Sequence, residues 1–162
     1  MRIIGRAAVV ALAAAVSPAL AAELQPIQQE MQTAHYRLDL QIGPMEQMYM
    51  AADVAAQHLT QGEVMLSGGM AMPKDMATAR HLEVHVYTLD KGAVVGDANV
   101  TIAVTDAQKT VQNIQIATMY GIAEGPSDTH YGNNVGLPPG TYTVDVTANG
   151  EKAAFKVTVP AG

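Results

Sequence analysis

The sequence predicts an all-β fold, an immunoglobulin-like antiparallel β-sandwich of about seven strands. Several short segments alternate apolar with polar residues, which is the pattern of strands that bury one face. Turn-forming Gly, Pro and Asn residues separate these segments. The Cys and Trp residues of antibody domains are absent from the chain, so the likeness to immunoglobulins concerns the architecture alone.

The first 21 residues have the features of a secretory signal peptide. Arg2 and Arg6 precede an apolar run over residues 7–16, and the Ala-Leu-Ala motif at 19–21 provides a cleavage site. The apolar run is too short to span a bilayer. We therefore expect export to the periplasm, cleavage before Ala22 and no membrane span in the mature chain.

The metal-binding domain is predicted to span residues 35–162, after a polar stretch at 22–34 that lacks periodicity and is expected to be a linker or N-terminal arm. Residues 35–42 alternate in polarity and predict the first strand. Good helix formers around residues 51–58 predict a short helix or loop. Residues 62–66 predict a further strand, which continues into a segment rich in Gly and Met.

The second half of the chain contains the clearest strand patterns. Residues 121–140 are expected to form a long loop that ends at a Pro-Pro-Gly turn. Asn149-Gly150 is a type I′ hairpin signal and predicts that the last two strands form a hairpin. Alternation or β-branched content predicts the strands 81–88, 100–105, 111–119, 141–148 and 153–159.

Composition excludes several classes of function. The chain has nine basic and 15 acidic residues, and loss of Arg2 and Arg6 with the leader takes the net charge from −6 to −8. No basic patch for nucleic acid is present, and no Cys is available for thiol catalysis, disulfides or zinc. Ser67 and Ser127 stand in no recognisable catalytic motif. We therefore expect no enzyme and no nucleic-acid partner.

Methionine is frequent for an exported chain without cysteine, with ten Met residues in the sequence. Thioether sulfur is a ligand that Cu(I) prefers, and it is more durable than a thiolate in an oxidising compartment. Met70 and Met72 lie beside glycines in a predicted exposed loop, where large apolar side chains have little to pack against. They are candidate metal ligands. The alternative is that Met fills gaps in a core poor in aromatic residues.

A second group of candidate ligands lies in the His-Leu-Glu-Val-His run at residues 81–85. With a rise of about 3.3 Å per residue, His81 and His85 stand roughly 13 Å apart along a strand and cannot chelate one ion together. His81 and Glu83 are about 6.7 Å apart on one face, so their tips can converge on a metal. The alternative is an ordinary solvated face of a strand.

His130 begins a His-Tyr-Gly-Asn-Asn run inside the predicted loop 121–140. Loops of this length in compact domains are often functional, which makes His130 a candidate ligand. The alternative is a turn in which Gly132 and an Asn adopt positive φ and His130 is merely exposed.

Together, these two His-containing runs resemble the periplasmic iron-transport protein family, mainly over residues 81–147. Members of that family are exported, immunoglobulin-like, copper-binding proteins that are encoded with iron permeases and commonly dimerise. The resemblance implies that His81 and Glu83 are metal ligands from one strand and that His130 is a ligand from the loop.

Two features depart from the family pattern. The family has a Met ligand shortly before its His-Tyr-Gly box, whereas here Met119 lies eleven residues upstream of His130 and Gly121 stands near the matching position. The family also has a later His ligand, and no His follows His130 in this chain. Met119 is therefore a candidate thioether ligand, and Met70 or Met72 are the alternatives.

The resulting hypothesis is a periplasmic protein that handles copper and/or iron for delivery, storage or coupled uptake. Its cofactor would be a copper ion, with iron as the second choice. The implied partners are an inner-membrane iron or copper permease and a second copy of the chain in a homodimer. The alternative is a metal-free sandwich that binds an envelope protein. The two differ in one geometric expectation, because only a shared metal site requires His81 and His130 to lie together.

Overall fold

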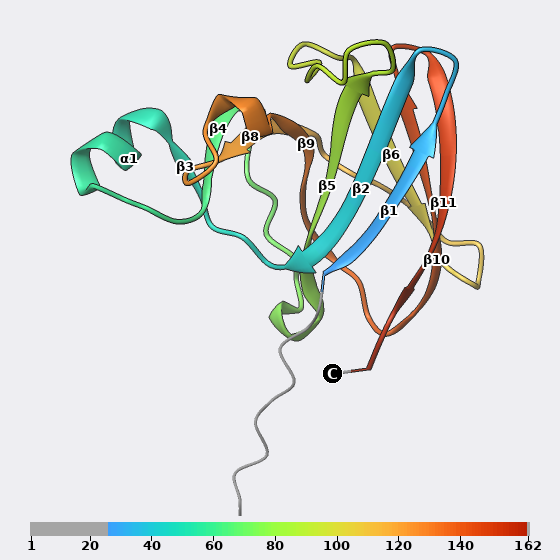
Figure 1. Ribbon diagram of the computed structural model, residues 1–162. Helices are drawn as coiled ribbons and strands as arrows, with labels where there is room; N and C mark the ends of the chain where they lie inside the picture. Colours follow the sequence, from blue (N-terminus) through green and yellow to red (C-terminus); the bar gives the residue numbers. More distant parts are fainter. Residues whose placement is uncertain (1–25, 162) are drawn as a thin grey trace, which may run out of the picture.

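The computed structural model describes residues 26–161, so the predicted signal peptide lies outside the described residues. Within this range the chain forms two β-sheets, one short α-helix and two 3₁₀ turns (Figure 1). The helix is α1 (Ala51–Gln57), and the 3₁₀ turns are Met76–Thr78 and Pro126–Asp128. The strands are β1 (Ile27–Gln32), β2 (Tyr36–Pro44), β3 (Met48–Met50), β4 (Glu63–Ser67), β5 (Ala79–Thr88), β6 (Val100–Thr105), β7 (Val111–Asn113), β8 (Ala117–Gly121), β9 (His130–Gly136), β10 (Gly140–Ala148) and β11 (Glu151–Val159).

The two sheets form a sandwich with unequal layers. The larger has the strand order β1-β2-β5-β9-β8-β4-β3, and the smaller has the order β11-β10-β6-β7. Neighbouring strands are antiparallel except β3 and β4, which are parallel. Strands β3, β4 and β8 and helix α1 lie to one side of the sandwich (Figure 1).

The prediction of an all-β, immunoglobulin-like sandwich is confirmed. Among residues 26–161 the sheets contain eleven strands, more than predicted. The additional strands are β1, β3 and β9, and the predicted strand 111–119 divides into the two short strands β7 and β8. None of the helices in this range has the length and apolar character that a membrane crossing needs.

The core lies between the sheets and is built from every second residue of the long strands. On β5 the even-numbered residues Leu82, Val84 and Val86 are fully buried against the smaller sheet, where Val144 and Phe155 are equally buried. Each such side chain stabilises the fold by about 1.5–3 kcal/mol. The odd-numbered residues of β5 therefore point away from this core, onto the other face of the larger sheet.

The expected long loop at 121–140 is wrong in its second half, because His130–Gly136 forms strand β9 at the centre of the larger sheet. Six of its seven residues are buried, and they include polar residues and glycine. A strand covered on both faces by protein lacks the apolar–polar alternation that marks a half-buried strand. The His-Tyr-Gly-Asn-Asn run is thus a strand and not a turn.

The expected linker or arm at 22–34 is also corrected. Ile27–Gln32 forms the edge strand β1, which pairs with β2 over six residues. Four of its six residues are exposed, so the segment is polar and shows little periodicity. The predicted hairpin at the C-terminus is present, with positive φ at Asn149 and Gly150.

Candidate metal centre

Strand register brings four ligand-type side chains together on the outer face of the larger sheet. On β5, His81 pairs with Asn134 and Glu83 pairs with Gly132 of β9, so His130 lies two residues further along the same face. Two strands away, Glu63 of β4 pairs with Gly121 of β8. The ligand atoms of Glu63, His81, Glu83 and His130 all lie within 4.8 Å of one another.

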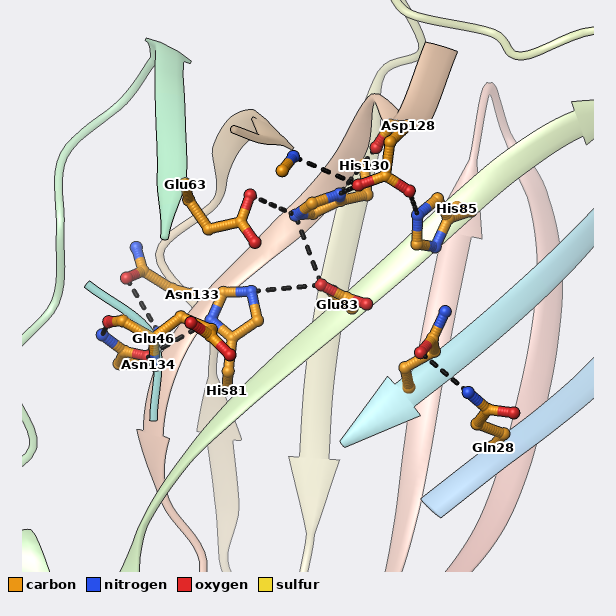
Figure 2. A network of polar contacts seen from close by, with 12 residues as sticks. Gln28, Glu46, Glu63, His81, Glu83, His85, Asp128, His130, Asn133 and Asn134 are labelled. Carbon is orange, nitrogen blue, oxygen red and sulfur yellow. Dashed lines mark hydrogen bonds and ion pairs between the residues drawn. The ribbon is translucent and has the colours of Figure 1, made fainter. Parts of the chain in front are cut away.

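The side chains converge on a common point (Figure 2). His130 Nε2 is 3.4 Å from Glu63 Oε2 and 3.3 Å from Glu83 Oε2, and His81 Nε2 is 3.3 Å from the same Glu83 oxygen. The rings of His81 and His130 have centroids 6.0 Å apart. The expectation that these two residues lie together is confirmed, and the solvated strand face considered as the alternative is wrong, because His81 is only 3% exposed.

Hydrogen bonds at Nδ1 orient both imidazoles. His130 Nδ1 lies 2.7 Å from the main-chain oxygen of Asp128, which can only accept, so Nδ1 carries the proton. His81 Nδ1 likewise donates to Asn134 Oδ1 at 3.2 Å. Both rings therefore present Nε2 to the two carboxylates, in the arrangement by which metal-binding histidines are commonly held.

Three buried atoms at the convergence point lack a hydrogen-bond partner among the described residues. They are Glu63 Oε2, His81 Nε2 and His130 Nε2. Buried polar atoms are nearly always satisfied, so an unsatisfied group of this kind needs an explanation. A cation bound between them would satisfy all three.

Burial and mutual charge shift the protonation of the cluster. Burial raises the pKa of Glu63 to about 7, against the attraction of the two nearby histidines. Burial would lower the pKa of His130, but Asp128, Glu83 and Glu63 outweigh it and raise the pKa to about 9. Burial would raise the pKa of Glu83, but the adjacent imidazole of His81 and the charge of His130 lower it. Without a metal, the proton on His130 balances the ionised Glu83.

A second group adjoins the first and shares His130 with it. The carboxylate of Asp128 accepts a hydrogen bond from His85 Nε2 at 3.0 Å and from the Gly121 N–H at 3.1 Å, and it lies 3.6 Å from His130 Nδ1. Burial acts to raise the pKa of Asp128, but the neighbouring His130, Gly121 and His85 donors lower it to about 2. This carboxylate is therefore ionised and supports His130 from behind.

The methionine candidates lie in two different places. Met119 is fully buried and is the cross-strand partner of His130, so its thioether lies on the face that carries the cluster, packed with Met48. Met70 and Met72 are 38% and 60% exposed. Their loop is anchored through its backbone to Asn133, which alternates with His130 along β9 and so belongs to the other face of the strand.

Sequence reasoning missed three members of these groups: Glu63, His85 and Asp128. Glu63 is the sole carboxylate in its short strand, which has no histidine, and only the pairing of β4 with β8 brings it to the cluster. His85 was correctly separated from His81 but not recognised as a partner of Asp128. The Asp-x-His spacing of Asp128 and His130 was the one usable signal.

A buried set of two imidazoles and two carboxylates is thus a candidate metal centre on geometric grounds. Comparison of the chain with protein-family models, with curated proteins and with solved structures gives no match.

Proposed function

We propose that this chain is an exported, periplasmic metal-binding protein that holds copper, with iron as the second choice. The site consists of Glu63, His81, Glu83 and His130. The observation that carries the proposal is the convergence of three buried, unpartnered donor atoms from β4, β5 and β9. The role would be delivery, storage or coupled uptake of the ion, which needs no turnover chemistry.

The donor set favours a transition metal over calcium or magnesium. Imidazole nitrogen suits copper, iron and zinc, whereas calcium and magnesium prefer oxygen donors alone. Two imidazoles and two carboxylates suit Cu(II) or iron, and a thioether from the adjacent Met119 would extend the site toward Cu(I). Met70 and Met72 would reach the ion only if their loop moved from its anchor on Asn133.

The resemblance to the periplasmic iron-transport family supports the same site. His81, Glu83 and His130 are the three positions that the resemblance carries over, and they are three of the four that meet here. The inner-membrane permease and the homodimeric partner rest on this resemblance. The alternative of a metal-free interaction module is disfavoured, because only a shared metal site requires His81 and His130 to lie together, and their rings are 6.0 Å apart.

Metal analysis and titration test the proposal. Protein purified from its own periplasm should contain copper or iron by elemental mass spectrometry. His81→Ala and Glu63→Gln should each weaken copper affinity at least about tenfold by calorimetric titration. His58→Asn is the matched control, because it removes an imidazole outside the cluster and Asn tolerates the left-handed backbone there. Equal affinities in all four proteins would contradict the proposed site.

A further inference from the structure

A cavity of about 650 Å³ opens onto the metal centre. It is lined by the carboxylates of Glu46, Glu63, Glu83, Glu124 and Asp128, and neither Lys nor Arg is among the described residues around it. Glu63 and Glu83 belong to the metal centre, and Asp128 supports His130. Glu46 and Glu124 are neither ligands in the metal centre nor partners of His130, so the proposed function assigns them no role.

Gly121 makes room for Glu124 at this cavity. A Cβ atom at position 121 would collide with Glu124 Oε2 and would lie 3.1 Å from Asp128 Oδ2. Gly121 is also the cross-strand partner of Glu63. The missing side chain thus leaves space for carboxylate groups directly beside a ligand of the metal centre.

Glu46 is held at the cavity by the same amide that orients a metal ligand. Asn134 Oδ1 accepts from the Glu46 N–H at 3.2 Å, and Asn134 Nδ2 donates to the Glu46 carbonyl at 2.8 Å. The same Oδ1 accepts from His81 Nδ1. Figure 2 shows Glu46 beside His81. The backbone of Glu46, which carries this half-buried side chain, is therefore tied to the position of the His81 imidazole.

The inner wall of the cavity points to the charge of its ligand. Glu63 and His81 both line it, are 8% and 3% exposed, and each has a buried donor atom without a hydrogen-bond partner. A passage lined by carboxylates that ends on such atoms attracts a cation and repels an anion.

We propose that Glu46 and Glu124 form an outer capture site, through which the metal centre takes its ion as a free hydrated cation and excludes anionic metal chelates. This inference rests on the proposed function, since the ion captured is the one that the inner cluster binds. Clefts lined by charge of one sign raise association rates by about 10- to 1,000-fold, and salt weakens the effect. Carboxylate oxygens at the rim would also begin to replace the hydration shell before the ion reaches the imidazoles.

Association kinetics of copper with the mature protein test this inference. Cu(II) in a weakly coordinating buffer is mixed with wild-type protein and with the Glu46→Gln/Glu124→Gln double variant, and binding is followed by stopped-flow absorbance. The double variant should associate about tenfold more slowly at low salt and lose most of its salt dependence. Its dissociation rate should stay within about twofold of wild type, since rim charges act mainly on association.

The Asp90→Asn/Asp145→Asn double variant is the control. Both residues are exposed and lie outside the cavity, and the two substitutions remove the same total charge as the Glu46→Gln/Glu124→Gln pair. The control should associate at the wild-type rate. The Cu(II)–nitrilotriacetate complex, an anion, should load the Glu46→Gln/Glu124→Gln variant faster than wild type.

Equal association rates in wild type and the Glu46→Gln/Glu124→Gln variant would overturn the capture site while leaving the metal centre intact. Equal slowing in the control would also overturn it, by showing an effect of net charge alone. A faster dissociation with unchanged association would assign the two carboxylates to the inner site instead. Failure of wild-type protein to bind copper would overturn the capture site and the copper centre together.

Discussion

At the scale of single residues, the chemistry of the candidate site depends on groups outside the four proposed ligands. Asn134 Oδ1 and the main-chain oxygen of Asp128 each accept a hydrogen bond from a ring Nδ1–H and so decide which nitrogen of His81 and His130 is free. A histidine without such a partner can present either nitrogen. The tautomers, and with them the donor set, are properties of β9 and of the turn before it.

Copper binding to the wild-type protein should release a proton at neutral pH. The Asp128, Glu83 and Glu63 carboxylates outweigh burial and raise the pKa of His130 to about 9, so a metal on Nε2 must displace a proton there. The affinity should rise about tenfold per pH unit from about pH 7 to about pH 9, and more steeply below about pH 7, where Glu63 must also lose a proton. Calorimetry in two buffers of different ionisation enthalpy counts the protons. His130→Gln should flatten this slope and His58→Asn should keep it; an affinity independent of pH would exclude His130 as a ligand.

The sequence contained enough information to predict His81, Glu83 and His130, because these residues stand in motifs with recognisable spacing. It could not predict Glu63, because residues 59–68 contain no other carboxylate and no histidine. Its place in the cluster follows from two strand pairings, β4 with β8 and β8 with β9. Pairings between strands that are distant in the chain cannot be inferred from the spacing of residues in a single sequence.

At the scale of elements, the close approach of β5 and β9 holds the two histidine strands in place. A Cβ atom at Gly132 would collide with the carbonyl oxygen of Leu82 and would lie 2.9 Å from the Cα of Glu83. Glycine at this position lets the backbones of β5 and β9 approach each other closely beside the Cα atom of Glu83. The residue that looked like a turn former in the sequence is thus a contact between strands.

Gly132→Ala should therefore damage both stability and metal binding. The added methyl group would force β5 and β9 apart, at a cost of about 1–3 kcal/mol, and would shift Glu83 relative to His130. Gly136→Ala on the same strand β9 is the matched control, since a Cβ there makes only ordinary contacts, at 3.9 Å and 4.0 Å, and φ is not positive. Urea denaturation and copper titration of both variants measure the two effects. If the two alanine variants behave alike, close packing at Gly132 is not needed.

At the same scale, a strand could be predicted from the sequence where apolar and polar residues alternate clearly along it. Strands β2, β10 and β11 bury one apolar face and alternate clearly, and β5 alternates in polarity although both of its faces are buried. Strand β9 is covered on both faces and is built from polar residues and glycine, and β1 is an exposed edge. Neither strand has the regular alternation of apolar and polar residues by which a strand is recognised in a sequence.

At the scale of the whole molecule, the metal centre and the core lie on opposite faces of one sheet. The smaller sheet covers the apolar face, and the cluster occupies the other face on β4, β5 and β9. The protonation states of the buried, charged groups of the site therefore affect the free energy of unfolding, and their titration should be visible in global unfolding.

The metal-free protein should lose stability as the pH rises above neutral. The pKa of His130 is raised from 6.5 to about 9 in the folded chain, so its protonated form stabilises the fold below pH 6.5 and this stabilisation is lost toward pH 9. Glu63 acts in the same direction at lower pH, because burial raises its pKa from 4.5 to about 7 and its contribution is lost between about pH 4.5 and about pH 7. The melting temperature should fall by about 5 °C or more between about pH 6.5 and about pH 9. Circular dichroism melts with a chelator present measure it.

His130→Gln should reduce this alkaline loss, whereas His35→Gln, on an exposed ring, should preserve it. At acid pH the opposite sign applies to Asp128, whose pKa is lowered from 3.8 to about 2, so its contribution disappears as the pH falls toward 2. A melting temperature that is constant or rises from neutral to alkaline pH would contradict the assigned protonation of the cluster.

The alternation along β5 has a consequence for how such a protein can change. Even positions from Leu82 to Val86 build the interior, and odd positions from His81 to His85 carry imidazole and carboxylate. A one-residue insertion or deletion within this strand would exchange the two sets and place charged groups in the apolar layer. Substitutions can alter the ligands one at a time without disturbing the core, but β5 tolerates no change of length. Substitutions at the odd positions of β5 would therefore change the candidate metal site alone, whereas a one-residue change of register would disrupt both that site and the fold.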